Sequence, residues 1–237
     1  MTDRTTCAIH QPNLFPRLST LAKLYAADTW IVLDDVQFNA RDYQHRAWLQ
    51  RPDGIRGQWL TLPVHRSFGR ATRMNEVSLL EKDKTARRVA QLTHHYYGKS
   101  RHWPELRDIV QQVATATRFS NQLVDIAELS TRLILEHMGW QGTIVRSSQF
   151  SVRSERSARL ADLATALGAS EYLCGTGGAR YLDESPFAQQ GITIRYVALP
   201  RAHVLHKSKR ISGLWWLAAA SWDELRGLFW RDWAIAS

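Results

Sequence analysis

Short apolar runs alternate with amphipathic segments near the start of the chain. Residues 5–10 predict a buried strand, and after a proline-containing loop the apolar positions of residues 18–25 recur at helical spacing. Residues 29–34 form a mostly apolar run of strand length, which is typical of a strand covered on both faces in a parallel sheet. The first 35 residues therefore predict a β-loop-α-β unit with a right-handed crossover.

The same periodicities continue along the chain, and the Trp-rich tail is expected to be helical. Helices are predicted at 83–97, 103–116, 121–138 and 155–167, a glycine and proline turn at 51–57, and strands at 59–64, 143–148, 171–174 and 192–199. This order predicts an α/β fold with a mainly parallel, Rossmann-like sheet and an additional helical layer. No repeat or linker divides the chain, so residues 1–237 are expected to form one domain with a helical C-terminal segment from about residue 200.

Composition narrows the class of protein. The chain has 237 residues, of which 44% are hydrophobic and 22% charged, which are ordinary values for a globular domain. No run of about 18 apolar residues occurs and the first residues carry no signal-peptide pattern, so we expect no membrane span and a cytoplasmic location. The two cysteines, Cys7 and Cys174, are expected to be free thiols.

The formal net charge is +9. Basic residues cluster at 66–73, 82–88 and 201–210, which favours attraction to a polyanion such as a nucleotide or tRNA. A basic surface without a ligand explains the same clusters, because no nucleic-acid motif accompanies them. Both interpretations stay open at this point.

Polar residues follow four of the predicted strands. Ligands of open α/β sheets bind beyond the carboxyl ends of the strands, so residues at these ends are candidate site residues. They are His10, Gln11 and Asn13 at the end of the first strand, Asp34 and Asp35 at the end of the second, Ser147 and Ser148 at the end of the strand at 143–148, and Gly175, Thr176, Gly177 and Gly178 directly after the strand at 171–174. If these strands are parallel, all four segments meet at one edge of the sheet.

Each candidate residue type carries its own chemistry. His10 can act as a general base or donate a hydrogen bond to a phosphate or carboxylate. Adjacent strand residues point to opposite faces, so only one of Asp34 and Asp35 is expected to face the cleft and orient a substrate. The glycines of 175–178 let backbone N–H groups approach an anion, and a helix predicted at 179–182 would add positive potential. Their spacing matches neither a dinucleotide fingerprint nor a Walker loop.

Further candidates surround these segments. Arg180 and Tyr181 follow the glycines, and Arg46 is a candidate anion-binding residue. Cys174 is expected to be dispensable, because a buried strand cysteine is commoner than a nucleophile. No CxxC pair occurs, and His94 and His95 are adjacent rather than spaced as ligands, so we expect neither a metal nor another cofactor.

Six blocks in order, AIHQPNLFP, LDDVQF, QHRAWL, WLTLPV, TIVRSS and YLCGTGGARYLDE, resemble the WbqC-like family from about residue 8 to about residue 197. The resemblance implies a bacterial enzyme of surface-polysaccharide or natural-product pathways that acts as a transferase, with glycine as a candidate transferred group. The residues that match the family blocks are His10, Gln11, Pro12, Asn13, Asp34, Asp35, Gln37, Gln44, Arg46, Gly175, Gly177, Gly178, Tyr181 and Asp183. The chain departs from the family at Cys174, where many relatives carry a small hydroxyl residue, and beyond residue 200.

Three functions remain open. The first is transfer of an acyl or aminoacyl group, with glycyl as one candidate, from a small-molecule or carrier-bound donor to an amine or hydroxyl. In this reaction His10 is the base and the glycines hold the oxyanion. The second is nucleotidyl transfer, since HQPN at 10–13 and HKSKR at 206–210 loosely resemble the HIGH and KMSKS signatures, although Gln11 and Pro12 replace the usual glycine. The third is a non-catalytic protein that binds tRNA or another anion. The oligomeric state is left open.

Overall fold

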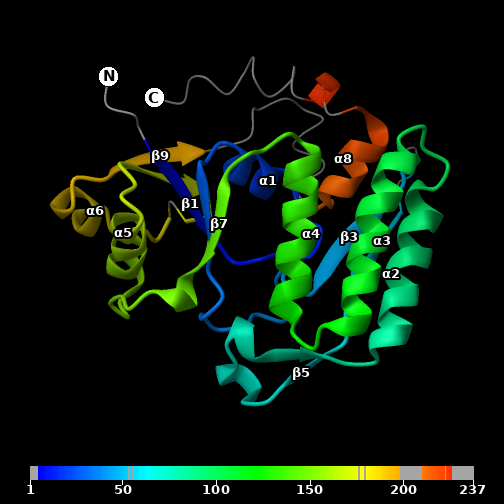
Figure 1. Ribbon diagram of the computed structural model, residues 1–237, viewed down its shortest axis with the longest axis horizontal. Helices are drawn as coiled ribbons and strands as arrows, with labels where there is room; N and C mark the ends of the chain where they lie inside the picture. The colour runs from blue at the N-terminus through cyan, green and yellow to red at the C-terminus, as the bar shows by residue number, and fades with distance from the viewer. Residues whose placement is uncertain are drawn as a thin grey trace.

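Five parallel strands form the central sheet of the protein (Figure 1). The computed structural model describes residues 5–52, 54, 56–175, 177–178, 180–197, 210–221 and 223–225. The strand order is β7-β2-β1-β8-β9. The strands are β1 (Thr6–His10), β2 (Thr29–Val32), β7 (Thr143–Arg146), β8 (Glu171–Gly175) and β9 (Thr193–Val197). The predicted α/β class with a mainly parallel sheet is therefore confirmed.

The strand order reverses between β1 and β8. From β1 the chain moves outward through β2 to β7, and it then returns to the other side of β1 to add β8 and β9. We call the place between β1 and β8 the switch point. In open α/β sheets this is where ligands bind, beyond the carboxyl ends of the strands.

The two faces of the sheet bury separate apolar clusters, because successive strand residues point to opposite sides. Ala8 of β1 belongs to the larger cluster, on the side of α1 (Leu18–Tyr25) and α4 (Leu123–His137). Ile9 belongs to the smaller cluster, on the side of α5 (Arg156–Ala166) and α6 (Ser185–Gln189). Figure 1 shows these two helix pairs on opposite sides of the sheet.

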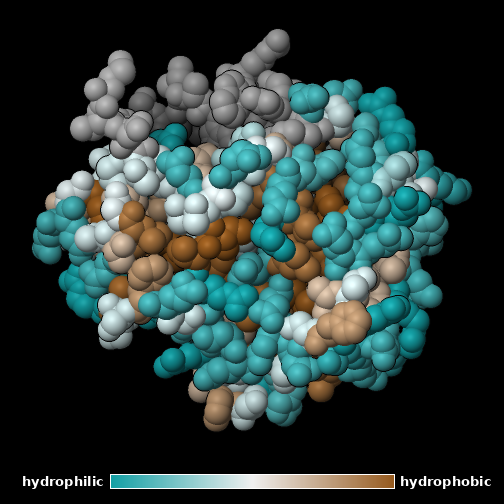
Figure 2. Space-filling model, viewed as in Figure 1, coloured by the Kyte–Doolittle hydropathy of each residue, from teal (hydrophilic) through white to brown (hydrophobic). Residues whose placement is uncertain are grey.

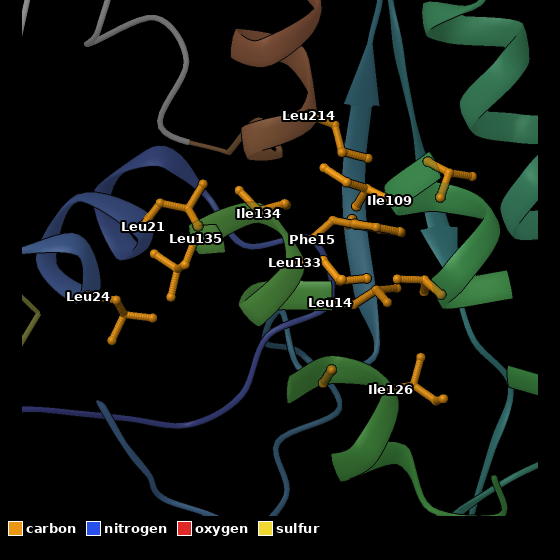
Figure 3. Close-up of a cluster of buried hydrophobic side chains, with 14 of the residues drawn as sticks. Leu14, Phe15, Leu21, Leu24, Ile109, Ile126, Leu133, Ile134, Leu135 and Leu214 are labelled. Atoms are coloured by element: carbon orange, nitrogen blue, oxygen red, sulfur yellow. The ribbon is translucent and has the colours of Figure 1, made fainter. Parts of the chain in front are cut away.

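The larger cluster extends into the predicted helical layer. Its helices are α2 (Lys82–Tyr97), α3 (Trp103–Phe119), α4 and α8 (Gly213–Ala219). Figure 3 shows Leu14 and Phe15, from the loop after β1, in one buried cluster with Leu21 of α1, Ile134 of α4 and Leu214 of α8. Residues 201–209, 222 and 226–237, which hold most of the expected Trp-rich tail, lie outside the described residues.

Two small antiparallel ribbons lie outside the main sheet. One pairs β3 (Arg46–Gln50) with β4 (Gly57–Thr61), and the other pairs β5 (Val64–Arg66) with β6 (Val77–Leu79). The strand predicted at 59–64 is confirmed over residues 59–61, which belong to β4. Its continuation is wrong, because the chain breaks at Leu62 and Pro63 and residue 64 begins β5 in the other ribbon. Three short 3₁₀ turns complete the described elements: η1 (Gly69–Ala71), η2 (Met74–Glu76) and η3 (Ser147–Gln149).

The surface follows this arrangement. Figure 2 shows hydrophilic residues over α2 and α3, whereas apolar residues reach the surface around β7, which is an edge strand. Within the part of the chain that the structure describes, no helix has the length and hydropathy to cross a membrane.

Candidate functional site

The four polar segments lie at one edge of the sheet, as the sequence predicts for parallel strands. His10 ends β1 and Gly175 ends β8. Asp34 comes two residues after β2, and Ser147 directly follows β7. The contacts divide these residues into two groups, one at the switch point and one between β2 and β7.

At the switch point, β1 and β8 separate toward their carboxyl ends. The pairing of β1 with β2 continues to His10, and that of β8 with β9 continues to Gly175. Between β1 and β8, however, only Thr6 and Cys7 have partners in register. The last residues of β1 and β8 are therefore not paired with each other.

Lys23 from α1 occupies this space. Its Nζ donates to the carbonyl oxygen of Ile9 at 2.9 Å and lies 3.3 Å from His10 Nδ1. Its Cδ would be 3.6 Å from a Cβ placed on Gly175, so the lysine side chain runs beside the end of β8. Lys23 therefore joins β1 to β8 at the point where their ladder ends.

Thr20 completes the surroundings of the imidazole. Its Oγ1 lies 3.4 Å from His10 Nε2, so each ring nitrogen of His10 faces a side chain of α1. Thr20 and Lys23 are three residues apart and share one face of the helix. The sequence interpretation missed both residues. The available signal was two polar side chains at helical spacing among the apolar positions of α1.

Burial and charge both act on the His10–Lys23 pair. Burial lowers the pKa of His10 well below 6.5, and the positive charges of Lys23 and Arg17 lower it further, against a hydrogen bond with Asn13. Burial lowers the pKa of Lys23 to about 8, with Cys174 and Cys7 acting in the opposite direction. Among the described residues no carboxylate forms an ion pair with Lys23. Because the pKa of His10 lies well below 6.5, its imidazole is neutral at pH 7.

Asp34 and Asp35 form the second group together with Ser147 and Ser148. Ser148 donates to Asp34 from its backbone N at 3.0 Å and from its Oγ at 2.7 Å. Ser147 Oγ lies 3.1 Å from Asp34 Oδ1 and 2.5 Å from Asp35 Oδ1. The Asp34 carboxylate thus connects the segment after β2 to the end of β7. Asp34 is only 2% exposed.

The carboxylate of Asp35 is also engaged by neighbouring side chains. It forms an ion pair with Arg159 of α5. Burial would raise the pKa of Asp35, but the hydrogen bond from Ser147 and the contact with Arg159 outweigh it and hold the pKa below 3.8. Within the described part of the chain neither aspartate hydrogen-bonds to His10; instead both carboxylates lie against the hydroxyl of Ser147. The expectation that the two carboxylates face apart is therefore wrong, because both turn toward β7 after the strand has ended at Val32.

The loop after His10 is fixed by contacts with three other segments. Gln44 Nε2 donates to Gln11 Oε1 at 2.5 Å, and Thr131 Oγ1 of α4 donates to the carbonyl oxygen of Asn13 at 2.9 Å. Phe15 has a φ of 42°, a left-handed conformation that is costly for a bulky residue. Ser212 donates to the carbonyl oxygen of Phe15 at 2.9 Å and helps to hold it. Gln11, Asn13 and Gln44 thus take part in fixing the loop that follows His10.

Arg46 and Gln37 contact other parts of the protein. The Arg46 guanidinium lies 4.2 Å from the ring centre of Trp59, and its Nε donates to the carbonyl oxygen of Asp42 at 3.1 Å. Gln37 Nε2 donates to the carbonyl oxygen of Arg70 at 2.6 Å. These contacts place both side chains in the ribbons and loops that follow β2, rather than beside His10.

The turn at 175–178 differs from its expected form. The N–H of Gly178 donates to the carbonyl oxygen of Gly175 at 2.9 Å, so it is not available to an oxyanion. The helix predicted at 179–182 is wrong, because Arg180 and Tyr181 lie in a turn, Leu182 has no regular structure, and α6 begins only at Ser185, next to Pro186. Thr176 lies outside the described residues.

The residues around this turn differ in exposure. Arg180 and Tyr181 are exposed, with Tyr181 packed 5.4 Å from the guanidinium of Arg156. Cys174 is buried and its pKa is raised by burial. A buried protonated thiol is a poor nucleophile.

The fold and this edge define a protein with a parallel α/β sheet and a histidine–lysine pair at the switch point. The sequence profile of the WbqC-like protein family matches residues 11–207, and the chain belongs to this family. It is similar to the uncharacterized protein Rv1507c of Mycobacterium tuberculosis, with 24% identity over 192 residues that cover 80% of each chain. No solved structure matches the chain.

Proposed function

We propose that the protein is a transferase that moves an acyl or aminoacyl group, with glycyl as one candidate, to an amine or hydroxyl acceptor. The observation that carries the proposal is His10, a neutral imidazole at the carboxyl end of β1, beside the reversal of strand order. Neutral histidine is the side chain most often used as a general base near neutral pH. The resemblance to a family of polysaccharide and natural-product pathways supports an acceptor of this kind.

In the proposed reaction His10 takes the proton of the acceptor as the acceptor attacks the carbonyl carbon of the donor. A bond forms between the acceptor nitrogen or oxygen and that carbon, and the ester or thioester bond of the donor breaks. The proton then passes from His10 to the departing oxygen or sulfur. Asp34 and Asp35 support this arrangement from β2 by fastening the neighbouring strand ends, rather than by contacting the imidazole.

The experiment uses hydroxylamine as a simple acceptor. The full chain is incubated with acyl-CoA, acyl phosphate or glycyl-tRNA, and the hydroxamate product is measured. His10→Gln should lower the rate by about 100-fold, as expected when a general base is lost. His95→Gln, at an exposed position of α2, is the matched control and should keep the wild-type rate. A folded His10→Gln variant with full activity would contradict the proposal.

Nucleotidyl transfer is the second candidate, favoured by one observation. Lys23 brings a positive charge without a carboxylate partner, among the described residues, to the place where such sheets bind nucleotides. The diagnostic reaction is exchange of labelled pyrophosphate into ATP in the presence of amino acids. Exchange that depends on His10, without hydroxamate formation from preformed acyl donors, would favour this candidate over acyl transfer.

A further inference from the structure

His10 and Lys23 are two bases in direct contact. The 3.3 Å separation of Lys23 Nζ and His10 Nδ1 permits one hydrogen bond, and the second hydrogen of the lysine goes to the carbonyl oxygen of Ile9. Lys23 is 5% exposed, so water screens the pair poorly. Two positive charges at this distance would repel strongly in such a site.

From this geometry we infer that the His10–Lys23 pair carries at most one positive charge, held on Lys23. We also infer that the protonation state of Lys23 determines which nitrogen of His10 can accept a proton from the substrate. Lys23 is thus a positioning residue that acts through His10. The pairing itself stands on the contacts alone, whereas its role in turnover rests on the proposed function.

The pair has two forms. With Lys23 protonated, its ammonium donates to Nδ1, and the hydrogen of the neutral imidazole sits on Nε2, facing Thr20 Oγ1. With Lys23 deprotonated, Nδ1–H donates to the amine and Nε2 carries a lone pair. Only the second form can accept a proton at Nε2. The Thr20 hydroxyl suits both forms because a hydroxyl can accept or donate a hydrogen bond.

The charged and titratable groups around the pair favour Lys23 as the group that loses its proton as pH rises. Arg17, before α1, opposes a second positive charge on His10. Cys7 of β1 and Cys174 of β8 lie on the strands against which Lys23 packs, and burial raises the pKa of both thiols, that of Cys7 to about 12. The thiols therefore stay neutral while Lys23, whose pKa is about 8, loses its proton.

The test follows the imidazole directly, without a substrate. Full-length protein is labelled with ¹⁵N at the histidine rings, and long-range ¹H–¹⁵N spectra are recorded from pH 6 to pH 10, with His10→Gln used to assign the signals. We expect His10 to be neutral throughout, with its hydrogen on Nε2 at pH 6 and on Nδ1 above the pKa of Lys23. An imidazolium at pH 6, or an unchanged tautomer up to pH 10, would overturn the inference.

Two variants distinguish the effect of the positive charge of Lys23 from the effect of the loss of its proton. Lys23→Arg keeps a positive charge that cannot be lost in this range, so the hydrogen of His10 should stay on Nε2 at every pH. Lys23→Met removes the charge, so the pKa of His10 should rise relative to wild type. If Lys23→Met does not fold, the wild-type titration and Lys23→Arg still decide the question.

Activity then distinguishes this inference from the proposed function. In the hydroxylamine assay the wild-type rate should rise roughly tenfold per pH unit below the pKa of Lys23 and level off above it, as for a base that must first lose a proton. Lys23→Arg should lose most activity and show no such rise. A tautomer switch in a protein without transferase activity supports the pair and rejects the function. Activity that is independent of Lys23 supports the function and rejects the positioning role.

Discussion

At the scale of single residues, the switch point is governed by a lysine that α1 buries beside His10. Its charge lacks a carboxylate partner among the described residues, and its Nζ contacts the carbonyl oxygen of Ile9 and His10 Nδ1. A buried cation with so little compensation costs folding free energy, and proteins retain such groups most often at functional sites. The cost can be measured separately from any activity.

Lys23→Met should remove a contribution to the free energy of unfolding that grows as pH rises through the alkaline range. The folded pKa of Lys23 is about 8, below its ordinary 10.5, so the unfolded chain binds more protons between these values and the wild-type free energy of unfolding gains a rising contribution with pH. The gain is on the order of 3 kcal/mol across this window and is absent below pH 8. Urea denaturation of both proteins at pH 7, 8, 9 and 10 checks it. Parallel pH profiles would show that Lys23 has an ordinary pKa.

Asp35 should act in the opposite pH range. Its folded pKa is lowered, so its contribution to stability is present above the unfolded value of about 3.9 and is lost as pH falls through the folded pKa. We expect Asp35→Asn to destabilise the protein at pH 7 and to unfold with a shallower acid dependence than wild type. Urea midpoints between pH 2 and pH 7 provide the measurement, and Asp42→Asn in the loop before β3 is a suitable control.

At the scale of elements, the turn after β8 is fitted closely to the strand that precedes it. A Cβ on Gly178 would lie 2.9 Å from Cys174 Sγ, and that sulfur is fully buried. The glycine is therefore required for packing against the strand, in addition to closing the turn onto Gly175.

Gly178→Ala should consequently destabilise the protein by about 1–3 kcal/mol, the usual cost of overpacking. Cys174→Ala removes the sulfur that the new methyl group meets, so the double variant should recover part of this loss. A double-mutant cycle from urea denaturation gives the coupling. Strict additivity of the two changes would show that the methyl group is accommodated elsewhere. Cys174→Ala alone should retain transferase activity, since the thiol is not proposed to react.

At the scale of the whole molecule, the parallel sheet and the helical layer could be predicted from the sequence. The strands of the sheet are short apolar runs, and α4 and α5 present regular apolar stripes, which are strong local signals. The ribbon of β5 and β6 could not be predicted, because each strand has only three residues and the two are separated by a loop with two 3₁₀ turns. Local periodicity carries no information on such partners.

The candidate site was predictable to a similar extent. The position of His10 at a strand end follows from local pattern, and the shared edge follows from parallel pairing. Lys23 could not be assigned, because its contact with His10 depends on where β1 and β8 stop pairing. Asp34 and Asp35 looked like cleft residues for the same reason: their hydrogen bonds go to Ser147, which is more than a hundred residues away in the chain.

The central position of β1 also determines when its two edges can pair during synthesis of the chain. Cys7 meets Thr29 of β2 soon after both leave the ribosome, but Thr6 must wait for Glu171 to close its other side. Until about three-quarters of the chain has been made, one flank of β1 presents unpaired N–H and C=O groups, which are a template for association with other chains. Nascent chains stalled before residue 171 should therefore bind chaperones or aggregate, whereas chains stalled past the end of β9 should not; pelleting of arrested ribosome complexes measures the difference. The strand that carries His10 is thus the first to be synthesised and among the last to be fully enclosed.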